Sequence, residues 1–143
     1  MSAQRLYTPE MLSAAVELAN YPPLDPAPLS GTARSAACGS TLALGLALGD
    51  DGTIERTGMQ VRACAVGQAA AAIFARHATG RSPDQIARAL HDFQEWLSAG
   101  GNEPDWPDIA LIAPARDYPG RHGAMLLPWK AAMAALSSKA EPG

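Results

Sequence analysis

The sequence predicts an α+β domain in which helices pack on one face of a small antiparallel β-sheet. Three observations support this fold class. The chain of 143 residues is long enough to bury one core. A central stretch alternates apolar and small residues in the manner of paired strands, and apolar residues recur at helical spacing before and after it. The order helix, strands, helices favours α+β over alternating β–α units, with residues 1–143 forming a single domain.

The first predicted element is a helix over about residues 9–20, within TPEMLSAAVELAN. Thr8 is a suitable N-cap, Pro9 fits the first helical position, and Met11 begins an apolar face. Prolines and glycines are then dense in YPPLDPAPLSGTARS. This composition predicts a loop over residues 21–35.

The stretch STLALGLALGDDGTIERTGMQVRA has the pattern of a β-hairpin. Leu42, Leu44, Leu46 and Leu48 alternate with small residues, and DDG supplies the turn before a return strand. Gly45, inside the first strand, predicts a bulge or the close approach of a neighbouring helix.

Three helices are predicted after the hairpin. AVGQAAAAIFARHATG is apolar at helical spacing and stops at Gly80. SPDQIARALHDFQEWLSAGG begins with Ser82 as N-cap and Pro83 at the first helical position. The last helix covers about residues 121–137, and residues 138–143 are expected to form a flexible tail.

Composition excludes several functional classes. The net charge of −3, with scattered basic residues, gives no basic stripe for nucleic acid. No apolar run is long enough for a membrane span, and the N-terminus lacks the pattern of a signal peptide. Two cysteines without a secretion signal favour the reducing cytoplasm. No phosphate loop, Ser-His-Asp series or paired carboxylates indicate an enzyme.

The two cysteines, Cys38 and Cys64, are candidate site residues. Cys38 lies at a glycine-containing turn before the first hairpin strand, and Cys64 lies where the return strand gives way to a helix. A helix N-terminus stabilises a thiolate. Because the ends of a hairpin meet in space, the two thiols are expected to converge at one end of the sheet. The alternatives are two separate buried thiols or, less favoured in a reducing compartment, a disulfide.

The ordered series of motifs resembles the U-type iron–sulfur cluster scaffolds: IscU, SufU and the N-terminal domain of NifU. AACGS is similar to the family's Ala-Cys-Gly-Asp turn, and LALGLALGDDGTIERTGMQVRACAVGQAAAAI to its strand–strand–cysteine–helix core. TGRSPDQI matches the link to the next helix, and YPGRHGAMLLPWKAAMAAL the C-terminal cysteine helix. The resemblance covers most of the chain. It implies cysteines gathered at one exposed end, which hold a transient [2Fe–2S] cluster or zinc. It also implies a cysteine desulfurase as sulfur donor and cluster-acceptor proteins as partners.

The chain departs from the family's ligand set. Ser40 stands where the family has an Asp, and alignment on LLPW puts Ala124 at the third Cys position and Gly123 at the neighbouring His or Lys position. A [2Fe–2S] cluster normally takes four protein ligands, so two thiols leave the set incomplete. His122, one residue from the family's ligand pair, is the candidate third ligand; the alternative is a surface or hydrogen-bonded histidine.

Three other polar residues have structural interpretations. His77, near the end of the helix that follows Cys64, is expected to cap that helix through its dipole. His91 is expected to be solvated on the polar side of the next helix. Arg62 is expected to cover the strand edge rather than to act on the thiol.

The leading hypothesis is an iron–sulfur cluster assembly scaffold-like protein, not an enzyme. It would bind iron, a [2Fe–2S] cluster or zinc through Cys38 and Cys64, with His122 as a further ligand. A dimer that shares the cluster would complete the ligand set. Two alternatives stay open: a zinc-dependent or metal-free sulfur acceptor, and a degenerate family member that acts as an interaction module.

Overall fold

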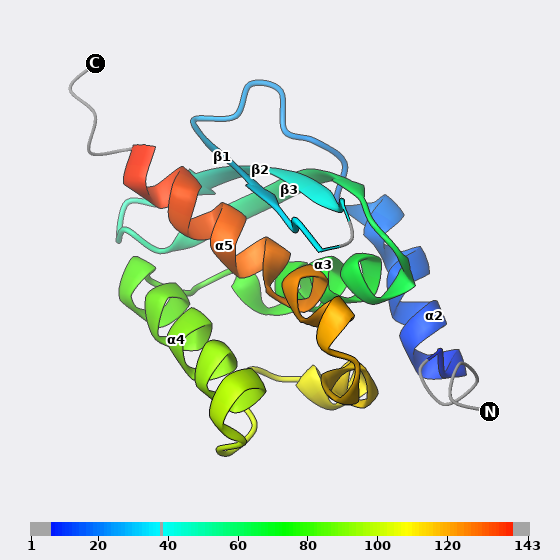
Figure 1. The fold of residues 1–143 in the computed structure, drawn as a ribbon. Coiled ribbons are helices and arrows are strands. Elements are labelled where there is room, and N and C mark those ends of the chain that lie inside the picture. The colour runs from blue at the N-terminus through cyan, green and yellow to red at the C-terminus, as the bar shows by residue number, and fades with distance from the viewer. Residues whose placement is uncertain (1–6, 38, 139–143) are drawn as a thin grey trace.

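The computed structural model describes residues 7–37 and 39–138, in which helices cover one face of a three-stranded antiparallel sheet (Figure 1). The predicted α+β class is confirmed. In this part of the chain no helix has the length and apolarity needed to cross a bilayer. The elements in chain order are α2 (Pro9–Val16), η1 (Glu17–Asn20), β1 (Leu29–Arg34), β2 (Thr41–Leu48), β3 (Ile54–Arg62), α3 (Ala65–Ala78), α4 (Pro83–Ala99), η2 (Ile109–Leu111), η3 (Ala113–Asp117), η4 (Pro119–Arg121) and α5 (His122–Ser138).

Local capping signals set the helix starts that the sequence predicts. The Thr8 hydroxyl accepts a hydrogen bond from the Met11 backbone N–H at 3.1 Å, which caps α2. Ser82 and Gln85 form a reciprocal capping box at the start of α4. Of the predicted tail over residues 138–143, Ser138 ends α5 and the remainder lies outside the described residues.

The prediction of a loop over residues 21–35 is wrong for Leu29–Arg34, which forms the strand β1 at the edge of the sheet. β1 pairs antiparallel with β2 along its whole length. Gly31 is required there because α5 lies directly over the strand, and a Cβ at this position would overlap the backbone of Ala131 and Ala135. This segment is therefore a strand because it pairs with β2 and packs against α5, and not because of an apolar pattern of its own.

The two faces of the sheet are covered differently. On the inner face, Leu42, Leu44 and Leu46 are buried beneath the helices. On the outer face, the loop before β1 covers one half of the sheet, where a Cβ at Gly45 would lie 2.9 Å from the Cβ of Ala27. Gly45 therefore marks the close approach of this loop, and not of a helix as one of the two predicted alternatives had it.

Helix α3 forms the centre of the core. Ten of its fourteen residues are buried, most of them alanines. Phe74 stacks on Trp106 at a centroid distance of 5.5 Å and meets the edge of Trp129 at 5.6 Å. Aromatic pairs of this kind contribute about 1 kcal/mol each beyond their buried area. Trp96, Trp106 and Trp129 are all buried packing residues.

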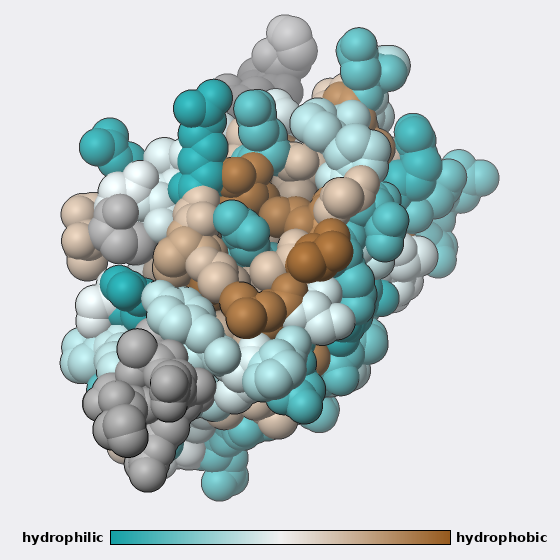
Figure 2. All heavy atoms as spheres, turned by 90° about the vertical axis from the view of Figure 1, so that its right-hand side faces the viewer, coloured by the Kyte–Doolittle hydropathy of each residue, from teal (hydrophilic) through white to brown (hydrophobic). Residues whose placement is uncertain are grey.

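Helix α2 lies on the face of the molecule where Figure 2 shows apolar side chains gathered at the surface. Met11 and Ala14 are buried. Leu12 and Val16, by contrast, are 45% and 76% exposed. The helix therefore leaves part of its apolar surface uncovered.

Candidate functional site

Cys64 is positioned by the junction between β3 and α3. It is the N-cap residue of α3, with extended backbone angles of φ −67° and ψ 175°. Its side chain makes no capping hydrogen bond, and the free thiol is half-buried at the edge of the core. The first N–H groups of a helix have no intrahelical partner and favour negative charge. The Cys64 sulfur thus lies at an electropositive helix end and does not take part in a capping hydrogen bond.

The loop between β1 and β2 carries the other cysteine. The Ser35 N–H donates to the Ser40 carbonyl at 2.8 Å, and the Gly39 N–H donates to the Ser35 carbonyl at 2.8 Å. Gly39 has φ 70°, a left-handed conformation that glycine adopts without strain. Cys38 itself lies outside the described residues. Its contact with Cys64, or with a metal, therefore stays a prediction.

The sheet register brings the loop close to Cys64. Thr41, the first residue of β2, lies opposite Arg34 of β1 and also opposite Arg62 of β3. The two ends of the β1–β2 loop and the β3–α3 junction therefore lie at the same end of the sheet.

The start of α5 packs against both of these segments. A Cβ at Gly123 would overlap the Ser35 hydroxyl of the loop. A Cβ at Gly67, in the first turns of α3, would lie 3.5 Å from the Cβ of Ala124. Three segments that are distant in sequence thus converge: the β1–β2 loop, the start of α3 and the start of α5.

His122 is the first residue of α5 and is half-buried. Its Nε2 lies 2.6 Å from the backbone carbonyl oxygen of Arg116. Because a carbonyl can only accept, Nε2 carries the hydrogen, and the lone pair of the neutral ring lies on Nδ1. Metal-binding histidines are commonly oriented by such a bond from the second ring nitrogen. The described residues nevertheless contain no group of three His, Cys, Asp or Glu side chains placed to hold one ion.

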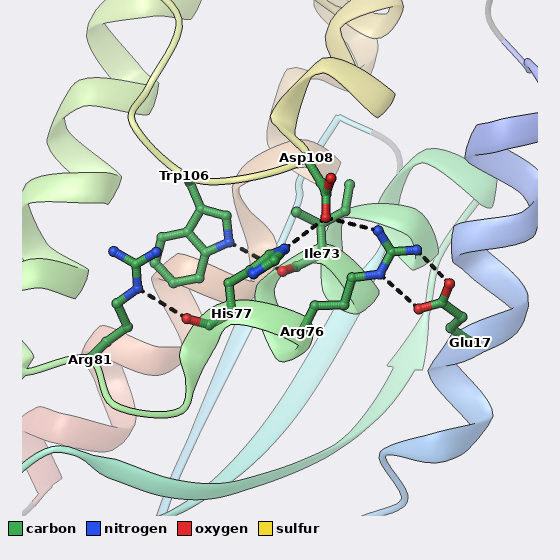
Figure 3. A network of polar contacts seen from close by, with 7 residues as sticks. All are labelled: Glu17, Ile73, Arg76, His77, Arg81, Trp106 and Asp108. Atoms are coloured by element: carbon green, nitrogen blue, oxygen red, sulfur yellow. Dashed lines mark hydrogen bonds and ion pairs between the residues drawn. The ribbon is translucent and has the colours of Figure 1, made fainter.

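The opposite end of α3 holds a network of polar side chains (Figure 3). Asp108 Oδ2 lies 2.7 Å from His77 Nε2 and 3.0 Å from Arg76 Nη1. Arg76 Nε also donates to Glu17 Oε1 at 2.7 Å. His77 lies in the last turn of α3, as predicted, and its ring also binds Asp108, while Arg81 Nε donates to its backbone carbonyl at 3.0 Å.

These contacts shift the titration of both carboxylates. Hydrogen bonding from His77, then from Arg76, lowers the pKa of Asp108. Hydrogen bonding from Arg76 lowers the pKa of Glu17, and the two carboxylates raise the pKa of the Arg76 guanidinium. No local sequence pattern predicts this network, since Asp108 lies 31 residues from His77. By contrast, His91 is confirmed as exposed, with 72% of its side chain accessible.

Comparison with known proteins shows which fold the chain shares and which proteins it resembles. No protein-family model matches the chain. The iron–sulfur cluster assembly scaffold protein IscU of Thermotoga maritima is 24% identical over 121 residues, which cover 83% of this chain and 84% of that protein. A nitrogen-fixing NifU-like protein (N-terminal) from Brucella abortus matches with a TM-score of 0.88 and 26% identity, over 99% of this chain and 100% of that one. The chain resembles the U-type scaffolds in sequence and in fold.

A second solved structure shares the fold. It is described as an iron–sulfur cluster assembly scaffold protein for the SUF system of Fervidobacterium islandicum AW-1. The TM-score is 0.79 with 18% identity, over 92% of this chain and 96% of that chain. The resemblance to U-type scaffolds found in the sequence motifs is therefore confirmed, and so is the fold.

Two departures from the U-type ligand set are buried in this chain. Ala124, at the position of the third cysteine, is fully buried, and Ser40, at the position of the Asp, is only 4% exposed. Neither side chain offers a metal ligand at the surface. The candidate donors are therefore the ones the sequence predicted: Cys64, His122 and, outside the described residues, Cys38.

The three converging segments offer sulfur and nitrogen donors but no carboxylate. Residues 35–40, 64–67 and 122–124 contain two cysteines and one histidine and no Asp or Glu. Thiolate and imidazole ligands suit iron and zinc, whereas Mg²⁺ and Ca²⁺ prefer carboxylate and carbonyl oxygens. The composition of this end of the U-type fold therefore matches soft or borderline metals.

Proposed function

We propose that this U-type homologue is an iron–sulfur cluster assembly scaffold that holds iron or a [2Fe–2S] cluster as transient cargo. Cys38 and Cys64 supply thiolate ligands, and His122 supplies a third ligand through Nδ1. One observation carries the proposal: the loop that bears Cys38, the N-cap Cys64 and the start of α5 converge at one end of the sheet. The names of the IscU and SUF-system relatives support the same role.

The chain's own residues explain how cargo would be held and released. Cys64 is half-buried and its side chain makes no capping hydrogen bond, so a metal can bind the sulfur without displacing such a bond. The hydrogen bond to the Arg116 carbonyl fixes the ring of His122. Three protein ligands leave a fourth position open, which an exogenous thiol or a second copy of the chain would fill. An incomplete ligand set favours transfer over permanent storage.

The partners proposed for this role follow from its chemistry. The cluster needs sulfide. A cysteine desulfurase would deliver sulfur as a persulfide, a two-electron reductant such as a thiol pair would reduce it to sulfide, and the finished cluster would pass to acceptor proteins. The protein acts as a scaffold rather than as a catalyst. Free thiols are maintained in a reducing compartment, so we place this activity in the cytoplasm.

A second candidate function is that of a sulfur acceptor, either metal-free or with zinc. It is favoured by the burial of Ala124 and Ser40, which limits the ligands that the chain offers. The unengaged Cys64 thiol at a helix N-terminus is a suitable nucleophile for persulfide sulfur.

Anaerobic reconstitution with ferrous iron and sulfide tests the proposal. The wild-type protein should gain the visible charge-transfer absorption of a cluster after desalting, and Cys38→Ser and Cys64→Ser should not. His122→Ala should weaken iron retention at least about tenfold. The matched control His91→Ala, at the exposed histidine, should behave as wild type.

Three outcomes contradict the scaffold proposal. A wild-type protein that gains no cluster absorption, or a Cys64→Ser variant that retains it, excludes ligation by Cys64. Zinc binding without cluster, together with a persulfide on Cys64 by mass spectrometry, supports the sulfur acceptor. Stability that is indifferent to chelators and to both cysteine substitutions indicates an interaction module.

A further inference from the structure

We infer that the open half of the outer sheet face is a docking surface for an extended acidic segment of a partner protein. This half forms a hollow of about 390 Å³. We call it the arginine groove. Its main lining residues are Thr32, Arg34, Thr41, Ala43, Gln60 and Arg62.

The sheet register fixes how the arginine groove is built. Arg34 lies opposite Thr41, which lies opposite Arg62, so the two arginines flank one hydroxyl across three strands. Strands are spaced about 4.8 Å apart, which places the two arginine Cα atoms about 10 Å from each other. Residues that alternate along a strand share a face, and both arginines are exposed. The next row across the sheet pairs Thr32 with Ala43 and Ala43 with Gln60.

The groove is closed at one end and reaches the neighbourhood of Cys64 at the other. Towards the far end of the sheet, the loop before β1 closes over the outer face, where a Cβ at Gly58 would lie 2.8 Å from the backbone nitrogen of Leu24. Figure 1 shows this loop arching over the sheet on the side away from α5. At the other end the groove reaches the β1–β2 loop and the β3–α3 junction next to Cys64. A segment bound here would therefore end beside the thiol.

The charges of the groove define what it can bind. Within the described residues, neither Arg34 nor Arg62 forms an ion pair or side-chain hydrogen bond, so both guanidinium groups are solvated. Residues 26–49 and 56–83, which contain the lining, hold no Asp or Glu even though the whole chain carries a net charge of −3. Guanidinium groups bind carboxylates through two parallel hydrogen bonds. The groove is therefore a local cationic surface on an acidic protein.

An extended peptide fits this arrangement better than a nucleic acid. Side chains on one face of an extended segment recur every two residues, about 6.8 Å apart, so long arginine side chains can reach two carboxylates with neutral residues between them. The Thr41 hydroxyl lies between the arginines, and the Thr32 hydroxyl and the Gln60 amide lie in the next row across the sheet, as partners for the peptide backbone. Specific nucleic-acid binding neutralises about 6–10 phosphates, which two arginines cannot do.

Binding of a fluorescein-labelled hexaglutamate peptide to the full chain tests this inference by fluorescence anisotropy. Wild-type protein should bind this probe at low ionic strength and not bind hexaglutamine. The R34E/R62E pair should weaken binding at least about tenfold. The matched control R56E/R88E makes the same change in net charge at two exposed arginines outside the groove and should stay within about twofold of wild type.

A second readout locates the bound peptide. Hexaglutamate should shift the backbone amide NMR signals of Thr32, Thr41 and Gln60 while leaving those of α4 unchanged. If R34E/R62E does not fold by circular dichroism, the milder R34Q/R62Q pair replaces it, with R56Q/R88Q as control.

Several results would overturn the inference. They are equal loss of binding in the groove and control pairs, full competition by inorganic phosphate at the same concentration, and tighter binding of a single-stranded oligonucleotide than of hexaglutamate. The assay contains no metal. Failure of the peptide to bind would therefore not contradict cluster binding at Cys64. Failure of reconstitution would likewise not contradict peptide binding in the groove.

Discussion

The two ends of helix α3 are built in opposite ways. At its C-terminal end, Arg76 binds both Glu17 and Asp108, and these polar side chains are committed to one another. At its N-terminal end, Cys64 occupies the cap position and makes no capping bond, while Gly67 packs tightly against its neighbours. The C-terminal end is held by ion pairs. At the N-terminal end the Cys64 sulfur makes no capping hydrogen bond and packs beside apolar residues. The contrast separates side chains that hold the fold from one that is free to bind a ligand.

The largest expected effect comes from Gly67→Val, in the first turns of α3 close to Cys64. A Cβ at Gly67 already lies 2.6 Å from the Ala63 Cβ, and alanine has no flexible end that can move away. We expect a loss of about 3 kcal/mol in the free energy of unfolding by urea denaturation, as for other overpacked cores.

Gly101→Val is the matched control for this substitution. A Cβ there meets no atom within 4 Å, so its cost should stay below about 0.5 kcal/mol. Equal stability of the Gly67 variant and wild type would show that α3 and α5 are not in close contact near the thiol.

An intermediate effect is expected at the anchored end from Arg76→Met. The substitution removes the bonds to Glu17 and Asp108 but keeps an apolar stem. Because these side chains are partly exposed, the loss should be about 1–2 kcal/mol in urea denaturation. Arg88→Met, on the exposed face of α4, serves as the control. Matching losses in both variants would refute an anchoring role for the network.

The smallest effect at neutral pH, and the most specific, is the pH dependence of Asp108→Asn. Hydrogen bonds from His77 and Arg76 lower the pKa of Asp108 in the folded state. A depressed carboxyl pKa stabilises the fold above the unfolded value of about 3.9, and this stabilisation is lost as pH falls through the folded value. The melting temperature of wild type should therefore fall more steeply than that of Asp108→Asn between about pH 6 and pH 3.

The backbone allows this test, since Asp108 has φ 69° and asparagine tolerates that conformation. Asp50→Asn, in the exposed turn after β2, should retain the wild-type slope. Identical slopes in all three proteins would exclude Asp108 as a source of the acid sensitivity.

Helices were predictable because their signals are local. Thr8, Ser82 and Gly80 mark helix ends by their own capping chemistry, and the structure uses all three. The strand β1 was missed because Gly31 and its small neighbours carry no apolar alternation. Its identity comes from pairing with β2 and from the cover that α5 provides, both of which are long-range contacts.

The candidate site was predictable in part. The strand-to-helix change placed Cys64 at a helix N-terminus, which the structure confirms. The Arg116 carbonyl that orients His122 had no sequence signal. The arginine groove depends on strand register, which brings Arg34 and Arg62 to one row although 28 positions separate them in the chain.

The high alanine content of α3 limits how the structure around Cys64 can move. Alanine has no side-chain torsion, so the six buried alanines of this helix cannot repack around a displaced neighbour. Cys64, at the N-terminal end of this helix, therefore has a rigid support. Any opening at the proposed metal site would come instead from the described residues of the β1–β2 loop or from the first turn of α5.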